Sequence, residues 1–449
     1  MLPFPNAHEM KRMCKKYSKY QKKVRLINEL LTVWRLDICR NWDKMVSIKG
    51  EHGLSPYSLL LFLNAGAFNQ KGREGKNMKR ITAILLALML LLTGAALAED
   101  TIKIGVFEPL TGSYAGGGAM EVEGIELAHE MYPEVLGKQI ELVKADSKSD
   151  KVEASMAAQS LVDAGVVAVL GSYSSGLTLA GSDVFAEAEI PALTATSTNP
   201  TVTLLSDWYA RICFIDPFQG TMLARFAVEN EYKKIAIIQE IESEYAVGLV
   251  NYFEAELANH DGYEVTSKGN FVNTDQDFTT LLTEALSKEP DVIFTCVGYA
   301  PSAALIIKQA RELGYEGPIF GGDTLDAPEL YQIAGEKVDG VIFTTFYDAA
   351  QPATELTTQF LEAYAAKYGK TPAATTVMAF DCYLTMRNAI ETAGTTDPEA
   401  VREALFATSG FVGAAGTITL DENHDAIRPV VFKKVNGDGT SEFLSLIEP

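Results

Sequence analysis

The stretch VVAVLGSYSSGLTLAGSDVFAEAEIPALTATSTNP, residues 166–200, contains two short apolar runs separated by a segment of helical length. The runs Val166–Leu170 and Ile190–Ala195 lack a regular alternation of polar residues, which is typical of strands buried on both faces of a sheet. The segment between them carries Asp183 and Phe185 and is predicted to form a helix. A strand, a helix and a second strand in this order predict a parallel pair joined by a helical crossover.

The same alternation continues along residues 99–449. Further strands are predicted at Ile102–Phe107, Ile140–Ala145, Ile235–Gln239, Val265–Phe271, Val292–Cys296 and Val341–Phe346. Helices are predicted at Val152–Ala164, Gly220–Asn230, Phe278–Ser287, Ser302–Leu313 and Glu355–Tyr368. Near-continuous apolar strands that alternate with helices indicate an α/β fold, with parallel sheets covered on both faces. A segment of about 350 residues favours two such lobes over one.

Residues 78–98 have the pattern of a secretory signal peptide. A basic start precedes the apolar run Ile81–Leu92, and a small-x-small cleavage motif ends at Ala98. The apolar run is shorter than the roughly 20 residues that a membrane span needs. We therefore expect translation to begin at Met78 and cleavage to follow Ala98, with residues 1–77 as translated upstream sequence outside the fold.

The charge of the chain changes sign at this junction. Residues 1–77 carry 15 Lys and Arg against 6 Asp and Glu, whereas residues 99–449 carry 21 against 53. Because like charges repel, so acidic a protein is a poor partner for nucleic acid or for an anionic membrane. No cysteine stands at the cleavage site after the apolar run, so the lipobox of a lipoprotein is missing and we expect a soluble product released into the periplasm.

The residue pattern gives no sign of catalytic or metal chemistry. Each cysteine of the mature part lies in or beside an apolar stretch, which favours buried free thiols over a disulfide. The histidines are scattered without metal-ligand spacing. No Ser-His-Asp set or pair of acids can be assembled, so we expect no enzyme activity, no metal and no cofactor. The residues concerned are Cys213, Cys296, Cys382, His129, His260 and His424.

Three strand ends lead into polar loops, where open parallel sheets bind their ligands. The loop Pro109–Gly118 is rich in glycine but lacks the ending and the spacing of a nucleotide-binding loop. The loop Gly171–Gly176 brings hydroxyls and backbone N–H groups to a helix N-terminus, which suits a carboxylate; simple N-capping is the alternative. The segment Ala195–Pro200 supplies a second cluster of hydroxyls.

Together with further short motifs, these loops resemble the leucine/isoleucine/valine-binding proteins, the type I periplasmic solute-binding components of ABC transporters. The motifs are, in order, Pro109–Gly112, Gly171–Gly176, Thr196–Pro200, Tyr245–Leu249, Lys308–Gly314, Ile333–Gly335 and Phe380–Tyr383. The resemblance covers essentially the whole mature chain. It implies two doubly wound parallel-sheet lobes, joined by three crossovers, that close over a solute. We assign 99–216 and 346–420 to lobe 1, and 217–345 and 421–449 to lobe 2.

Carried over position by position, the resemblance implies a ligand site. Ser175 and Thr198 would offer hydroxyls to the α-carboxylate of an amino acid, and Thr196 would offer mainly its backbone N–H. Asp323 would pair with the α-ammonium, since a zwitterion in a low-dielectric cleft needs partners for both charges. A capping role for Asp323 is the alternative. The aromatic positions of the second lobe match Tyr245 and Tyr299.

The chain departs from the family pattern at two pairs of positions. Gly117 and Thr375 stand where the family places aromatic residues around the ligand's side chain, so we expect a wider or more polar subsite. Ser149 and Ser174 stand where the family has two bridging cysteines, so that disulfide is absent.

The resemblance implies a monomeric receptor that delivers an amino acid to the permease subunits of an ABC transporter. The solute would be of the branched-chain type or a bulkier or more polar relative. The alternatives are a receptor for amides, urea or aromatic carboxylates on the same fold, and a ligand sensor for chemotaxis.

Overall fold

The computed structural model describes residues 101–348 and 354–449. The chain divides into two units, residues 1–97 and 98–449, and every described element belongs to the second unit. The upstream segment and the signal peptide expected from the sequence lie outside the described residues. Within the described part, no helix has both the length and the apolar character needed to cross a membrane.

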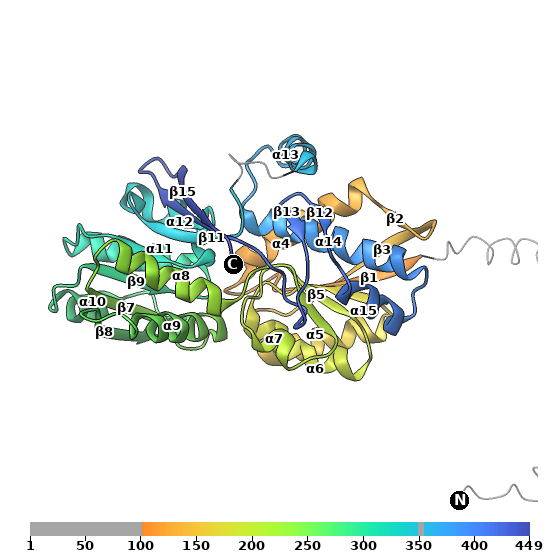
Figure 1. Ribbon diagram of the computed structural model, residues 1–449, viewed down its shortest axis with the longest axis horizontal. Coiled ribbons are helices and arrows are strands. Elements are labelled where there is room, and N and C mark those ends of the chain that lie inside the picture. Colours follow the sequence, from red (N-terminus) through yellow and green to blue (C-terminus); the bar gives the residue numbers. More distant parts are fainter. Residues whose placement is uncertain (1–100, 349–353) are drawn as a thin grey trace, which may run out of the picture. The chain divides into compact units, whose positions relative to one another are not determined.

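The first sheet has six strands in the order β2-β3-β1-β4-β5-β6, and every neighbouring pair is parallel except β2 with β3. Its strands are β1 (Ile102–Glu108), β2 (Glu134–Val135), β3 (Lys138–Asp146), β4 (Ala168–Leu170), β5 (Ala192–Thr194) and β6 (Tyr209–Arg211). The helices around it are α4 (Ala115–Met131), α5 (Lys151–Asp163), α6 (Ser175–Glu187), α7 (Thr201–Leu204), α14 (Ala374–Ala393) and α15 (Pro398–Phe406). These elements form the first lobe (Figure 1).

Helices cover both faces of the first sheet, as the apolar strands predict. Ile104 and Val106 of β1 pack into the core that contains side chains of α4 and α14, whereas Phe107 packs into the core formed with α5 and α6. Helices α4 and α14 approach each other closely at Gly124, where an added Cβ would lie 2.2 Å from the backbone oxygen of Thr376. Glycine at this position therefore allows the two helices to pack against each other.

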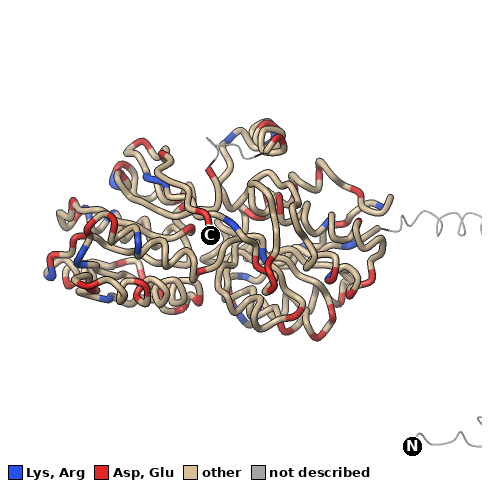
Figure 2. Tube along the Cα trace, viewed as in Figure 1, with Lys and Arg blue, Asp and Glu red and all other residues tan. Residues whose placement is uncertain are grey.

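The second sheet has seven strands in the order β15-β14-β11-β10-β9-β7-β8. Its strands are β7 (Lys234–Glu240), β8 (Glu264–Phe271), β9 (Val292–Cys296), β10 (Ile319–Gly321), β11 (Ile342–Thr345), β14 (Val430–Val435) and β15 (Ser441–Ile447). The helices around it are α8 (Asp216–Glu229), α9 (Glu244–Leu257), α10 (Thr279–Leu286), α11 (Ala300–Glu312) and α12 (Glu329–Ala334). These elements form the second lobe. Asp and Glu are spread over both lobes (Figure 2).

All eight predicted strands are confirmed to within two residues at each end, and the fold is the predicted α/β class. The expectation of parallel sheets is wrong at two edges: β2 is antiparallel to β3 in the first sheet, and β14 is antiparallel to both β11 and β15 in the second. Lys433 and Lys434 of β14 and Ser445 of β15 interrupt the continuous apolar runs that mark the central strands. The predicted start of α8 at Gly220 is also wrong, because the helix begins at Asp216 and accommodates Pro217 in its first turn.

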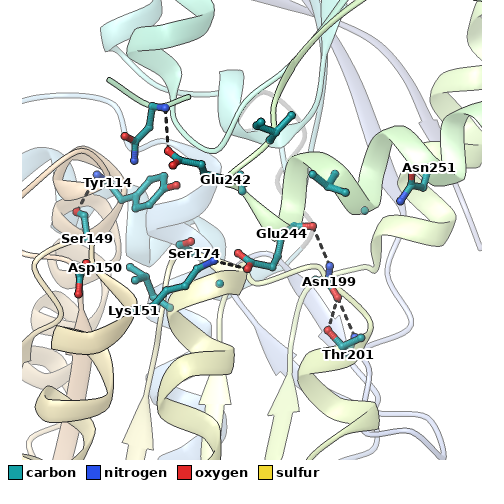
Figure 3. Close-up of a pocket in the computed structure, with 17 residues that line it drawn as sticks. Tyr114, Ser149, Asp150, Lys151, Ser174, Asn199, Thr201, Glu242, Glu244 and Asn251 are labelled. Atoms are coloured by element: carbon teal, nitrogen blue, oxygen red, sulfur yellow. Dashed lines mark hydrogen bonds and ion pairs between the residues drawn. The ribbon is translucent and has the colours of Figure 1, made fainter. Parts of the chain in front are cut away.

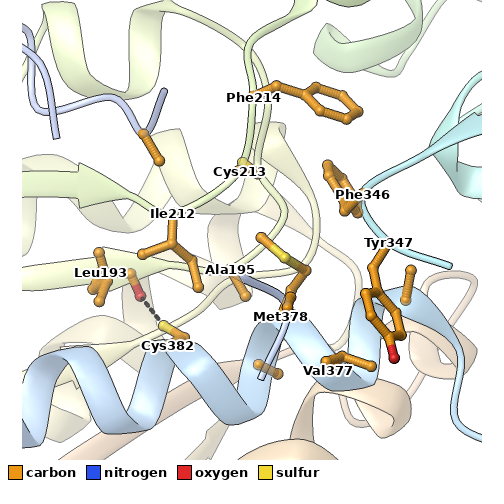
Figure 4. Close-up of a cluster of buried hydrophobic side chains, with 14 of the residues drawn as sticks. Leu193, Ala195, Ile212, Cys213, Phe214, Phe346, Tyr347, Val377, Met378 and Cys382 are labelled. Atoms are coloured by element: carbon orange, nitrogen blue, oxygen red, sulfur yellow. Dashed lines mark hydrogen bonds between the residues drawn. The ribbon is translucent and has the colours of Figure 1, made fainter. Parts of the chain in front are cut away.

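The chain passes three times between the sheets. It crosses after β6, returns after β11, and crosses again before β14. In the buried cluster drawn in Figure 4, Phe214 of the first connection packs against Phe346 of the second, with ring centroids 4.5 Å apart. The small sheet of β12 (Phe411–Gly413) and β13 (Gly416–Ile418), and helix α13 (Glu355–Tyr368), come between the second and third crossings. The residue boundaries given above for the two lobes stay a prediction.

Arg211, at the end of β6, is fully buried and joins segments that are far apart in the sequence. Its Nε donates to Asp425 Oδ1 at 2.5 Å, and its Nη1 donates to the backbone oxygens of Ser197 and Asn199 at 2.6 and 2.8 Å. Its Nη2 donates to Thr203 Oγ1 at 2.8 Å and to the backbone oxygen of Pro200 at 3.3 Å. The guanidinium therefore holds the loop after β5 against the segment that precedes the third crossing.

We predict that Arg211→Met lowers the free energy of unfolding by about 3–5 kcal/mol, because it leaves the Asp425 carboxylate buried without its charge partner. Arg225→Met is the matched control, since Arg225 pairs with Glu256 at the surface and such pairs contribute about 0–1 kcal/mol. Denaturant unfolding of the mature protein measures both variants. Equal stabilities of the two variants would contradict the role of Arg211.

Candidate ligand-binding site

The first lobe presents two predicted site hydroxyls at the carboxyl ends of neighbouring parallel strands. Ser175 begins α6 after β4, and Thr198 follows β5; both are buried. Ser175 Oγ accepts a hydrogen bond from the backbone N–H of Asn199 at 3.3 Å, so the two loops are joined. Thr198 Oγ1 is buried without a hydrogen-bond partner. A buried hydroxyl without a partner is unfavourable, so a ligand atom that hydrogen-bonds to it would stabilise the complex.

The third predicted residue of this lobe, Thr196, directs its hydroxyl to Glu121 Oε1. Glu121 on α4 lies next to Glu108 at the end of β1, and both carboxyl groups are fully buried. Burial raises the pKa of Glu121 to about 7, and burial together with the Glu121 charge raises that of Glu108 well above its ordinary value. Each carboxyl has one oxygen without a partner, which a proton shared between them would satisfy. No motif in the sequence predicted this acid pair, because Glu108 and Glu121 meet only in the fold.

The second lobe presents Asp323 directly after β10. Its Oδ1 accepts hydrogen bonds from Tyr245 Oη and from Gln219 Nε2, both at 2.7 Å. Burial raises the pKa of Asp323 to about 6, so the group is mainly ionised at neutral pH. The structure therefore brings Asp323 and Tyr245 together, as the sequence analysis expected of two residues of one site. Gln219 was missed, because only the fold places α8 beside β10.

Asp216 is a further buried acid, at the predicted boundary between the lobes, and was not among the predicted site residues. Its backbone N–H donates to the backbone oxygen of Thr198 at 3.0 Å, and neither carboxyl oxygen has a hydrogen-bond partner. Burial raises its pKa to about 8, so the carboxyl holds a proton at neutral pH and can donate a hydrogen bond. It lies where the chain enters the second lobe, on the same helix as Gln219.

Tyr299 is placed differently from the other predicted residues. Its hydroxyl donates to the backbone oxygen of Asn273 at 2.7 Å, and its ring packs edge-on against Tyr114 with centroids 5.7 Å apart. Tyr114 in turn donates to Glu240 Oε1 at 3.1 Å. Tyr299 therefore contacts the first lobe through its ring and has no hydrogen bond to Asp323.

A groove of about 800 Å³ is lined by both lobes (Figure 3). Lys151 of the first lobe forms an ion pair with Glu244 of the second, Nζ to Oε1 at 2.5 Å. Asn199 Nδ2 donates to the backbone oxygen of Glu244 at 3.0 Å. Thr198 and Asp323 are buried and do not line this groove. We therefore interpret the groove as the outer side of the contact between the lobes, distinct from the buried polar residues.

Among residues 101–348 and 354–449, no three His, Cys, Asp or Glu side chains are grouped so that they could hold a metal ion. The cysteines of this part, Cys213, Cys296 and Cys382, are buried with free thiols, as predicted. Burial raises the pKa of all three thiols. Thiols in this state are poor nucleophiles.

Comparison with known proteins shows the family. A model of a periplasmic binding protein family matches residues 101–440. The chain is 32% identical to the Leu/Ile/Val-binding protein BraC3 of Rhizobium johnstonii, over 78% of this chain and 94% of the relative. The crystal structure of the leucine-binding protein LivK of Thermotoga maritima superposes with a TM-score of 0.75 at 42% identity, covering 78% of this chain and 99% of that one.

The branched-chain amino acid transporter substrate-binding protein LivJ of Streptococcus pneumoniae, solved in complex with isoleucine, gives a TM-score of 0.73 at 30% identity. It covers 78% of this chain and is itself covered completely. Both structures share the two-lobe α/β fold described above. The chain thus belongs to the periplasmic binding protein family and is a relative of the Leu/Ile/Val-binding proteins.

Proposed function

We propose that this protein binds an α-amino acid between its two lobes and delivers it to the permease subunits of an ABC transporter. One observation carries the proposal. Buried hydroxyls on the first lobe can donate to an anionic group of the ligand, and a buried carboxylate on the second lobe can pair with a cationic group. Ser175 and Thr198 suit a carboxylate, and Asp323 suits an ammonium. A zwitterion entering a low-dielectric site needs both. The names of the relatives support the same class of solute.

We further infer that binding is not followed by chemistry. The site described above combines hydroxyls, acids and an amide, but it has no histidine, and the base of a hydroxyl nucleophile is most often a histidine. The Glu108 and Glu121 pair lies beneath Thr196 and is fully buried. The arrangement suits a receptor that acts by the closing of its lobes.

A receptor for amides, urea or aromatic carboxylates on the same fold is the second candidate. It shares the carboxylate or carbonyl partners of the first lobe but has no need of an acid at Asp323. A ligand sensor for chemotaxis would bind in the same way and differ only in the protein that it contacts. The charge at Asp323 therefore separates the first two candidates.

We predict that Asp323→Asn weakens the binding of an α-amino acid by about a hundredfold or more. The variant keeps the shape of the side chain but leaves the ammonium facing a neutral amide. A ligand without an ammonium group should lose much less. Calorimetric titration of the mature protein measures both, with Asp261→Asn as a control at an exposed position. Unchanged affinity of Asp323→Asn for amino acids would leave the second candidate as the better account.

We predict that Thr198→Val and Ser175→Ala each weaken binding by about 1–3 kcal/mol, the cost of a buried charged acceptor that lacks a donor. Thr198→Val should not lower the stability of the free protein, because its hydroxyl has no partner there. Ser267→Ala, which also removes a buried hydroxyl without a partner, is the control and should leave affinity unchanged. Unchanged affinity of both Thr198→Val and Ser175→Ala in calorimetric titration would remove Ser175 and Thr198 from the site.

We predict that the exported protein begins at Glu99. The signal sequence of residues 78–98 and the change of charge after it are the reasons. N-terminal sequencing of the protein recovered from the periplasm tests this. A product that retains residues 1–77 would show that translation starts upstream of Met78 and that the signal is not used.

A further inference from the structure

A small cavity of about 60 Å³ lies between the lobes, apart from the groove of Figure 3. By volume it can hold a few water molecules. The first lobe lines it with Gly116, Gly117, Met120 and Tyr173, and the second lobe lines it with Tyr299 and Glu329. No Lys or Arg is among the described residues that line it.

Tyr173 supplies an aromatic ring next to Gly117. A Cβ added to Gly117 would lie 2.4 Å from the Tyr173 ring, so the ring occupies the space that a side chain at position 117 would need. Tyr173 is buried, and burial and the charge of Asp323 raise its pKa well above the ordinary value. Tyr173 lies two residues before Ser175, and Ala327, which also lines the cavity, lies four residues after Asp323. The cavity therefore adjoins the two segments proposed to hold the amino acid.

Glu329, the first residue of α12, directs a carboxylate toward the first lobe. A Cβ added to Gly116 would lie 2.7 Å from Glu329 Oε1, so glycine at 116 makes room for the carboxylate. Glu329 Oε2 is buried without a hydrogen-bond partner. A buried carboxylate oxygen in this state is costly until a donor reaches it. The cavity therefore combines aromatic walls with an acceptor that lacks a donor.

The family resemblance already places the ligand's side chain beside Gly117, which lines this cavity. We propose that Glu329 makes the cavity select α-amino acids whose side chain carries a hydrogen-bond donor. This inference rests on the proposed function, because it presupposes that an amino acid lies between Ser175 and Asp323. The rings of Tyr173 and Tyr299 pack against the carbon atoms of the side chain, and Glu329 accepts from its polar end. An apolar side chain of the same size would leave the carboxylate buried without a donor, which disfavours it.

Pairs of amino acids of similar size test the inference in one titration series with the mature protein. The pairs are threonine with valine, asparagine with leucine, and lysine with norleucine. The parent protein should bind the polar member of at least one pair about tenfold or more tightly. Glu329→Gln removes the negative charge and should reduce the preference for lysine over norleucine. Glu329→Ala removes the acceptor as well and should reduce the preference for the polar member in every pair. Glu336→Gln is the matched control at an exposed glutamate of the same lobe and should keep it.

Tighter binding of the apolar member in all three pairs would overturn the proposal without any variant. A preference that survives unchanged in both Glu329 variants, with their folds verified by thermal unfolding, would also overturn it. Failure of the proposed function looks different, because then none of the six amino acids binds the parent protein. Binding of amino acids with an apolar preference thus refutes the role of Glu329 and leaves the receptor assignment standing.

Discussion

One buried guanidinium holds together the part of the first lobe on which the candidate site depends. Arg211 donates five hydrogen bonds, of which three end on backbone oxygens of the loop 197–200. That loop contains Thr198, and its Asn199 N–H reaches Ser175 Oγ. The charge partner, Asp425, comes from a segment more than 200 residues later, so the loop reaches its final geometry only when that segment has folded against β6. A buried charge is tolerated here because it is paired and fully hydrogen-bonded.

The same low-dielectric surroundings keep several acids in an unfavourable environment. The pKa values of Glu121, Asp216 and Asp323 are raised chiefly by burial, to about 7, 8 and 6. The folded protein thus binds these protons more tightly than the unfolded chain, so their contribution to stability is complete below pH about 4 and is lost as the pH rises through these values. An ammonium beside Asp323 would favour its ionised form, so ligand binding would recover part of that loss. The free energy of folding that is lost by ionising Asp323 in the free protein is thus partly recovered as binding free energy in the ligand complex.

The predictability of each feature from the sequence depends on how local its cause is. The central strands were predictable because burial on both faces requires continuous apolar runs, as in Val292–Cys296. The β14–β15 hairpin was not, because Lys433, Lys434 and Ser445 interrupt its apolar runs. Ser175, Thr198 and Asp323 were identified through a family resemblance, and the loops that carry them follow predicted strands. Their roles as ligand contacts stay a prediction. The contacts of Arg211 with Asp425 and of Gln219 with Asp323 connect distant segments, and no local pattern signals them.

Position 117 lacks the aromatic residue of the family pattern, but another part of the chain supplies an aromatic ring at the same place. The sequence at Gly117 indicates an open subsite, but the structure fills that space with the ring of Tyr173, which comes from the loop before α6. A carboxylate from α12 then faces the same space, again opposite a glycine. Tyr173 lies in the loop before α6 and Glu329 lies at the start of α12, outside the strands and the Arg211 contacts that position the hydroxyls. The side-chain subsite can therefore change its chemistry while the residues proposed to hold the α-carboxylate and the α-ammonium remain in place.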